Sequence, residues 1–169
     1  MSELLGVLSV SEEHIRRASY DDLSTLVEFN KALALETEDL RLLPEVVAAG
    51  VSAVLNDSTG SRGLYLVTEI DRIVVGGLMI TLEWSDWRNG NFWWVQSVYV
   101  RPEHRGKGVF RRLYSFAKQL ADADATSCGM RLYVEKDNRT AQRTYDSLGM
   151  QQTHYVVFEA LKPTLRFLE

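Results

Sequence analysis

Two closely spaced glycines stand in the basic stretch Arg105-Gly-Lys-Gly108, between two apolar segments of different period. The first segment, 92–100, alternates like a strand and stops before Pro102, which cannot donate to a sheet ladder. In the second, apolar residues recur at intervals of three and four, which predicts a helix from Val109 to about Ala123. A strand, a glycine turn without Cβ atoms and a helix start gather free main-chain N–H groups and the positive end of a helix dipole. This arrangement predicts an anion site.

Other phosphate-binding loops fit this stretch less well. A Walker loop requires Lys and then Ser or Thr after its last glycine, but Val109 and Phe110 stand there. A dinucleotide fingerprint requires a third glycine at Arg111. What remains, Arg105-x-x-Gly108-x-Phe110 preceded by Val-x-Pro, resembles the pyrophosphate loop of the GNAT superfamily of N-acetyltransferases. Phe110 departs from the pattern, because the superfamily prefers Gly or Ala at that position.

A second stretch, about thirty residues downstream, resembles the other signature of the superfamily. It reads Asn138-Arg-Thr-Ala141-Gln-Arg-Thr-Tyr145-Asp-Ser-Leu-Gly149-Met150. Asn138 is expected to cap a short helix that Gly149 ends. Taken alone, Tyr145 is more typical of a half-buried aromatic on a helix face than of a catalytic group. Both motifs in this order extend the resemblance over roughly residues 13 to 160.

The chain of 169 residues is one domain in size. We expect a mobile leader, Met1 to Glu12, and one domain, 13–169. The resemblance implies an α/β (α+β) GNAT fold, with a mixed, mostly antiparallel sheet of about six to seven strands, splayed in the middle, and about four helices. Periodicity and turn residues predict strands at 14–18, 64–70, 73–82, 92–100, 130–134 and 150–158. They predict helices after the cap Ser19 and at 44–56, 109–123 and 138–148.

The resemblance implies acetyl-CoA as co-substrate, no metal, and direct attack of a primary amine on the thioester in a ternary complex. Tyr145 is then the general acid that protonates the departing sulfur, and N–H groups near Val98 hold the oxyanion. The pantetheine arm is expected to lie along the strand 98–100 like an added strand. The residues expected to bind the cofactor are Val98, Tyr99, Val100, Arg105, Gly106, Lys107, Gly108, Val109, Phe110, Arg111, Asn138 and Tyr145.

The sequence indicates the base and the acceptor site less directly. Gln96 stands where polyamine-acetylating relatives carry a glutamate; it cannot accept a proton but can orient a water or the substrate. Glu83 is the first candidate base acting through water, with Glu36 and Glu38 as alternatives. All four tryptophans lie between 82 and 94. We expect Trp84, Trp94 and Glu36 to line an amine site through cation–π and charge contacts, although these tryptophans equally suit a dimer interface or a hairpin core.

The composition limits the classes of partner that this protein can bind. A net charge of −4, with basic residues concentrated at 101–112, argues against nucleic acid. The single Cys128 and three scattered histidines offer no metal spacing, and no apolar run is long enough for a membrane helix. We therefore expect a cytoplasmic protein, a homodimer being one option, that acts on a small, amino-acid-like or peptidyl amine. The alternative is a catalytically idle acyl-CoA-binding or interaction module of the same fold.

Overall fold

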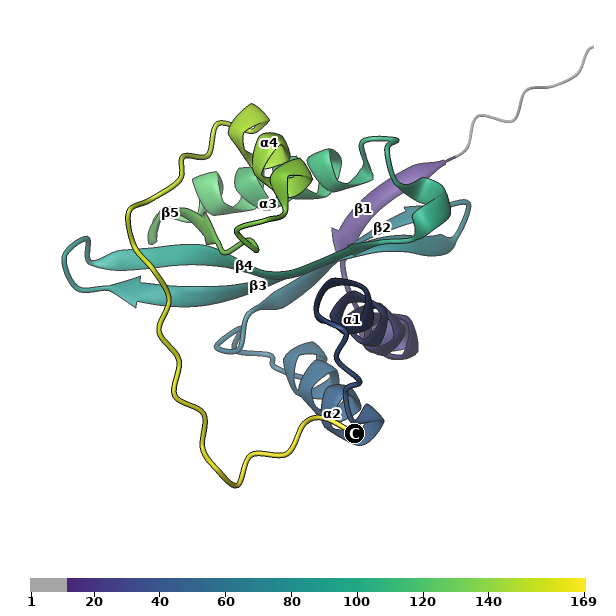
Figure 1. Cartoon of the computed structure of the whole chain (residues 1–169). Helices are drawn as coiled ribbons and strands as arrows, with labels where there is room; N and C mark the ends of the chain where they lie inside the picture. The colour runs from purple at the N-terminus through teal and green to yellow at the C-terminus, as the bar shows by residue number, and fades with distance from the viewer. Residues whose placement is uncertain (1–11) are drawn as a thin grey trace, which may run out of the picture.

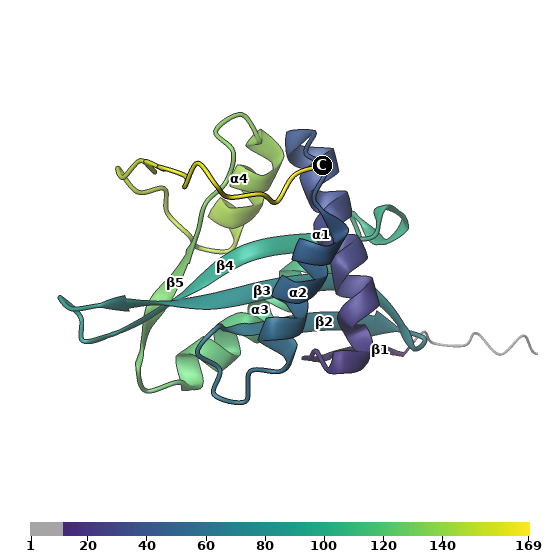
Figure 2. The same ribbon diagram turned by 90° about the horizontal axis from the view of Figure 1, so that it is seen from below.

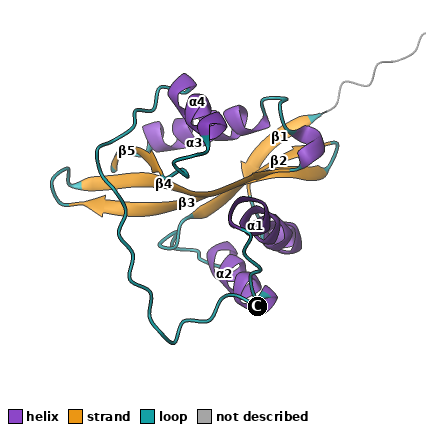
Figure 3. Ribbon diagram, in the orientation of Figure 1, coloured by secondary structure: helices purple, strands orange, loops and turns teal. Residues whose placement is uncertain are grey.

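The computed structural model describes residues 12–169, in which one five-stranded sheet has two helices on each face (Figures 1 and 3). The strands follow one another in chain order; the first four are antiparallel, and the last is parallel to its neighbour. The strands are β1 (Glu13–Arg17), β2 (Leu64–Ile70), β3 (Ile73–Ser85), β4 (Gly90–Val100) and β5 (Ser127–Leu132). The helices are α1 (Leu23–Glu38), α2 (Pro44–Leu55), α3 (Val109–Ala123) and α4 (Arg139–Ser147). The expected α+β class is confirmed.

The two predicted hairpin turns set the register of the antiparallel strands. Asp71 and Arg72 have φ of 50° and 67°, the left-handed pair that a two-residue hairpin turn needs. Asn89, with φ of 45°, precedes Gly90 at the start of β4. Asp71 and Asn89, residue types that tolerate this backbone region, therefore stand at the two turns.

Each face of the sheet carries its own apolar core. On one face, Leu66 and Leu78 pack with Leu113 of α3. On the other, Val67 packs with Leu26 and its neighbours on α1 and α2, which lie side by side in Figure 2. Neighbouring strand residues point to opposite faces, so Leu66 and Val67 serve different cores. The sheet is buried on both sides, which holds β4 rigidly between α1 and α3.

The middle of β4 is irregular. Ile80 pairs with Val95 and Met79 pairs with Ser97, so Gln96 is the extra residue of a bulge. The parallel ladder between β4 and β5 ends at Val95 and Leu132. Beyond the bulge, β4 is paired with β3 alone among the described residues. The two middle strands therefore splay apart after residue 95.

The predicted last strand, 150–158, is wrong in this structure, and the sheet has five strands rather than six or seven. The chain instead runs as an extended coil from α4 to α2, as Figure 1 shows in yellow. There Leu43 N–H donates to the Phe167 carbonyl at 2.9 Å, and Glu169 N–H donates to the Arg41 carbonyl at 2.9 Å. The sequence pattern favours a strand, but a strand forms only where an edge pairs with it.

Smaller differences concern element ends. β5 occupies Ser127–Leu132 rather than the predicted 130–134, and a 3₁₀ turn, Tyr20–Asp22, precedes α1 after Ser19. The predicted leader lies outside the described residues, apart from Glu12. No helix within 12–169 has the length and apolar character that crossing a bilayer requires.

Candidate active site

The loop before α3 presents a row of main-chain donors. Gly106 and Gly108 have φ of 72° and 79°, which the predicted glycine turn requires. Among residues 12–169, none of the amides from Gly106 to Arg111 donates to a protein acceptor. These donors sit at the start of a 15-residue helix, where the dipole adds positive potential. The residues present therefore fit a diphosphate group.

The guanidinium groups around this loop are engaged with the protein. Arg105 donates to the Val100 carbonyl at 2.8 Å, forms an ion pair with Glu36 at 2.7 Å and lies over the Tyr99 ring. Arg111 donates to Ser147 Oγ at 2.8 Å, which ties α3 to α4. Arg105 and Arg111 therefore hold the loop in place, while its amides are donors without a protein acceptor among residues 12–169.

The splayed edge of β4 adjoins this loop. Val98 packs into the α3 core, whereas Tyr99 packs on the other face, with its ring 4.9 Å from that of Phe29. Burial, then the hydrogen bond that its hydroxyl donates to Glu36, raises the pKa of Tyr99. With side chains fixed on both faces, the main chain of 96–100 offers an edge to which an extended arm can add.

Tyr145 is held on α4 beside the loop. Asn138 caps this helix, its Oδ1 accepting from Ala141 N–H at 3.0 Å, and Gly149 leaves it with φ of 82°, both as predicted. The Tyr145 ring meets Phe110 edge to face at a centroid distance of 5.8 Å. Burial raises the pKa of Tyr145, and its hydroxyl bonds to no group within 12–169. Phe110, the departure from the superfamily pattern, thus supports the ring of the expected acid.

A second group of side chains lies where β4 and β5 separate. Gln96 donates to Thr81 Oγ1 at 2.7 Å and accepts from the Tyr133 hydroxyl at 3.2 Å. Trp94 lies against Tyr133 at a ring-centroid distance of 6.0 Å. The Gln96 amide is therefore oriented at the bulge, beside an aromatic surface.

The candidate base Glu83 belongs to the same sheet face. It forms an ion pair with Arg131 at 2.5 Å, and the cross-strand pairing of Trp94 with Arg131 places both charges beside the aromatic pair. Sequence reasoning missed Arg131 and Tyr133. Their spacing of two on a strand was the available signal, since such residues share a face.

Two other expected acceptor residues lie apart from this group. Glu36 contacts Arg105 and Tyr99, so it lies beside the glycine loop before α3. Trp84 follows Glu83 on β3 and therefore points to the opposite face, with 61% of its surface exposed. Of the two tryptophans expected to line the amine site, Trp94 lies in this group, against Tyr133, and Trp84 does not. The alternative base Glu38 makes no hydrogen bond or ion pair to described residues.

Comparisons with known proteins identify the class of this chain. The model of the Acetyltransferase (GNAT) family matches residues 32–150, so the chain belongs to that family. It is an N-acetyltransferase of this family, whose typical co-substrate is acetyl-CoA.

Particular relatives add detail. A crystal structure of a possible acetyltransferase from Clostridium difficile 630 is 47% identical, with a TM-score of 0.82, and the match covers 89% of this chain and 97% of that one. Thialysine N-epsilon-acetyltransferase of Bos taurus is 27% identical over 81% of this chain and 83% of its own length. An L-methionine sulfoximine/L-methionine sulfone acetyltransferase of Salmonella typhimurium is 37% identical over 52% of this chain, and the match spans half of that relative.

Proposed function

We propose that this acetyltransferase moves the acetyl group of acetyl-CoA directly to the primary amine of an amino acid or a close analogue, within a ternary complex. One observation carries the proposal. In the part of the chain that the structure describes, the open β4 edge lies between a row of amides without protein acceptors on one side and the Gln96–Tyr133 and Glu83–Arg131 groups on the other. A diphosphate-linked arm and an amine can therefore approach the same point from opposite sides.

The residues divide the work as follows. The amides of 106–111 hold the diphosphate, and the edge 98–100 pairs with the extended arm. When the amine nitrogen bonds to the acetyl carbon, main-chain N–H groups near Val98 hold the oxygen that gains charge. As the carbon–sulfur bond breaks, Tyr145 gives its proton to the sulfur and later regains one from solvent. Its raised pKa supports this role, because the phenol stays protonated at neutral pH.

The amine must lose a proton before or during attack. Gln96 cannot take that proton, but its oriented amide can position a water molecule. We assign Glu83 as the acceptor of the proton through this water. Its carboxylate lies on the same face as Gln96, whereas Glu36 lies apart from Gln96, beside Arg105 and Tyr99.

The charges near the splay favour an amino acid as acceptor. An amino acid carries an ammonium and a carboxylate, which Glu83 and Arg131 match in sign. Trp94 and Tyr133 provide a surface beside them for an apolar or cationic side chain. Two relatives are named for acceptors of this class, a lysine analogue and methionine derivatives.

The test is release of free thiol from acetyl-CoA in the presence of single amines, with the acetylated product identified by mass spectrometry. The panel pairs each of several amino acids with the amine that lacks its carboxylate. We expect turnover with at least one amino acid and a kcat/KM at least about tenfold lower for its carboxylate-free partner, because a lost charge-assisted hydrogen bond corresponds to such a factor. Equal rates for both members of every pair would contradict the amino-acid assignment.

A further inference from the structure

The ion pair between Glu83 and Arg131 joins two groups that the acceptor has to engage separately. Glu83 matches the ammonium of an amino acid in sign, and Arg131 matches its carboxylate, yet each is the partner of the other at 2.5 Å. The two side chains are 44% and 31% exposed, respectively. An ion pair this exposed contributes little to stability, so a charged ligand can replace either partner.

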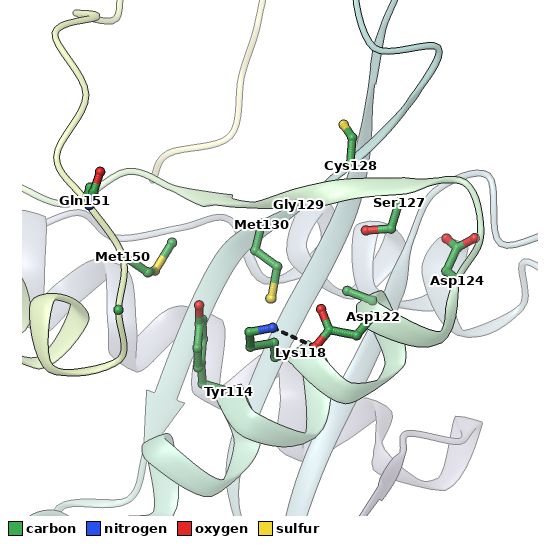
Figure 4. Close-up of a pocket in the computed structure, with 12 residues that line it drawn as sticks. Tyr114, Lys118, Asp122, Asp124, Ser127, Cys128, Gly129, Met130, Met150 and Gln151 are labelled. Atoms are coloured by element: carbon green, nitrogen blue, oxygen red, sulfur yellow. Dashed lines mark hydrogen bonds and ion pairs between the residues drawn. The ribbon is translucent and has the colours of Figure 1, made fainter.

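An aromatic ring holds the guanidinium of Arg131 independently of Glu83. Met130 points from β5 toward α3 (Figure 4), so Arg131, the next residue, lies on the opposite face of the sheet. There its Cζ lies 3.6 Å from the centroid of the Phe92 ring. Phe92 is 8% exposed and is the cross-strand partner of Glu83. This cation–π contact keeps the guanidinium in place when its anionic partner changes.

The guanidinium also has hydrogen-bond donors that Glu83 does not use. Arg131 donates to Glu83 through Nη1, and its Nε and Nη2 donate to no protein group within 12–169. An incoming carboxylate can therefore form two parallel hydrogen bonds, which are stronger than the single contact with Glu83. The charge of this carboxylate repels Glu83, while the ammonium of the same molecule attracts it. Binding of an amino acid thus exchanges one ion pair for two.

We propose, on the basis of the amino-acid acceptor assigned above, that Arg131 blocks Glu83 in the free enzyme and that the carboxylate of the acceptor releases it. The released Glu83 oxygen accepts, through water, the proton that the ammonium loses, and passes it to solvent after the product leaves. An amine without a carboxylate leaves the Glu83–Arg131 pair closed, so it reacts slowly even where it fits the site. Arg131 therefore determines which amines are acetylated rapidly, in addition to binding one of them.

The experiment supplies the carboxylate separately from the amine. The substrate is the carboxylate-free partner of the amino acid with the highest kcat/KM, at saturating acetyl-CoA, with either sodium propionate or the same concentration of sodium chloride. Propionate carries a carboxylate but no amine, so it is no acceptor itself. We expect propionate to raise kcat/KM of the wild type about two- to fivefold and saturably, because an exposed ion pair corresponds to such a factor.

Three variants separate release of Glu83 from other effects of charge. Arg131→Gln removes the partner of Glu83, so it should show the raised kcat/KM without propionate and no response to it. Arg131→Lys keeps a cation that can pair with Glu83 and should stay at the low value without propionate. Arg88→Gln is the matched control, because the Arg88 Cζ lies over the same Phe92 ring, at 5.2 Å, but its side chain forms no ion pair within 12–169. It should respond to propionate as the wild type does.

Two results would overturn the proposal. One is a wild-type kcat/KM that propionate leaves unchanged or lowers, a result that depends on no variant. The other is a folded Arg131→Gln enzyme that acetylates the carboxylate-free amine no faster than the wild type, since Arg131 would then only bind the acceptor. In both cases a wild-type preference for the amino acid would leave the proposed function standing. Equal rates for both members of every substrate pair would instead contradict the proposed function, and with it the release of Glu83.

Discussion

Gly108→Val is the sharpest test of the amide loop, because the structure separates its effect on stability from its effect on binding. Gly108 has φ of 79°, a region that costs a β-branched residue about 1–3 kcal/mol. The added Cβ would lie 2.9 Å from Arg112 Nη1, the end of a flexible side chain that can move aside. We therefore expect a folded variant whose Tm is lower by roughly 2–12 °C, at about 2–4 °C for each kcal/mol in a chain of this size.

The effect on binding should be larger. Acetyl-CoA at about 100 times its Kd should stabilise the wild type by roughly 2.7 kcal/mol, or about 5–11 °C in Tm. In Gly108→Val the side chain keeps the backbone from approaching the diphosphate, so this shift should disappear. Thermal melts with and without acetyl-CoA measure both effects.

Gly60→Val provides the matched control. Gly60 has φ of 71°, and a Cβ there would meet nothing within 4 Å. This variant should lose similar stability yet keep the full acetyl-CoA shift. An undiminished shift in Gly108→Val would refute the assignment of the diphosphate to this loop.

Three further predictions concern single side chains. Glu83→Gln should raise the KM for the amine by about tenfold or shift the pH profile of kcat, and should leave the acetyl-CoA melting shift unchanged. Normal amine kinetics at every pH would exclude Glu83 as the base and leave Glu36 and Glu38 as candidates. Arg131→Gln should abolish the preference for an amino acid over its carboxylate-free partner in paired kcat/KM measurements, and a retained preference would remove Arg131 from the acceptor site. Asp22→Asn should lower the free energy of unfolding by about 2 kcal/mol in urea melts at pH 7, and by less at pH 3. An equal loss at both pH values would contradict this prediction.

The pH dependence of the last prediction follows from the surroundings of Asp22. Burial raises the pKa of this carboxyl, but hydrogen bonds from Arg16 and from Ser19 outweigh it and bring the pKa below its ordinary value. A carboxyl with a depressed folded pKa stabilises the protein above its unfolded pKa of about 3.9. This contribution fades as the pH falls through the folded pKa, so the difference between wild type and Asp22→Asn should shrink in acid.

Local chemistry explains which parts of the fold could be predicted from the sequence. The turns at Asp71-Arg72 and Asn89-Gly90, the glycines before α3 and the Asn138 cap each depend on residues within a few positions. The predicted start and end of α3, Val109–Ala123, match the structure. Such features depend on backbone preferences and caps that neighbouring residues supply.

Features formed by distant residues could not be predicted in the same way. The ion pair of Glu83 with Arg131 joins residues 48 positions apart, and the contact of Phe110 with Tyr145 joins two helices. The predicted strand at 150–158 shows the opposite error. Its alternation fits a strand, but alternation does not say which edge will pair with it, or whether that edge belongs to the same molecule.

The central claim is that Tyr145 donates the proton to the departing sulfur, and Tyr145→Phe tests it most directly. Phenylalanine keeps the edge-to-face contact with Phe110 and removes only the hydroxyl, which bonds to no described group. Tyr114→Phe is the matched control, because the Tyr114 ring also meets Phe110, at 6.1 Å, but lies on α3 rather than on α4, which carries Tyr145.

The measurement is kcat at saturating acetyl-CoA and amine for both variants, from pH 6 to above the ordinary tyrosine pKa of about 10. We predict a fall in kcat of about 10²-fold or more for Tyr145→Phe, with an unchanged Tm and acetyl-CoA shift, and near wild-type activity for Tyr114→Phe. In the wild type, kcat should fall through deprotonation of the Tyr145 hydroxyl only above that ordinary pKa, because burial raises the pKa of Tyr145. Full turnover in a folded Tyr145→Phe enzyme would contradict the account, since water would then protonate the leaving thiolate.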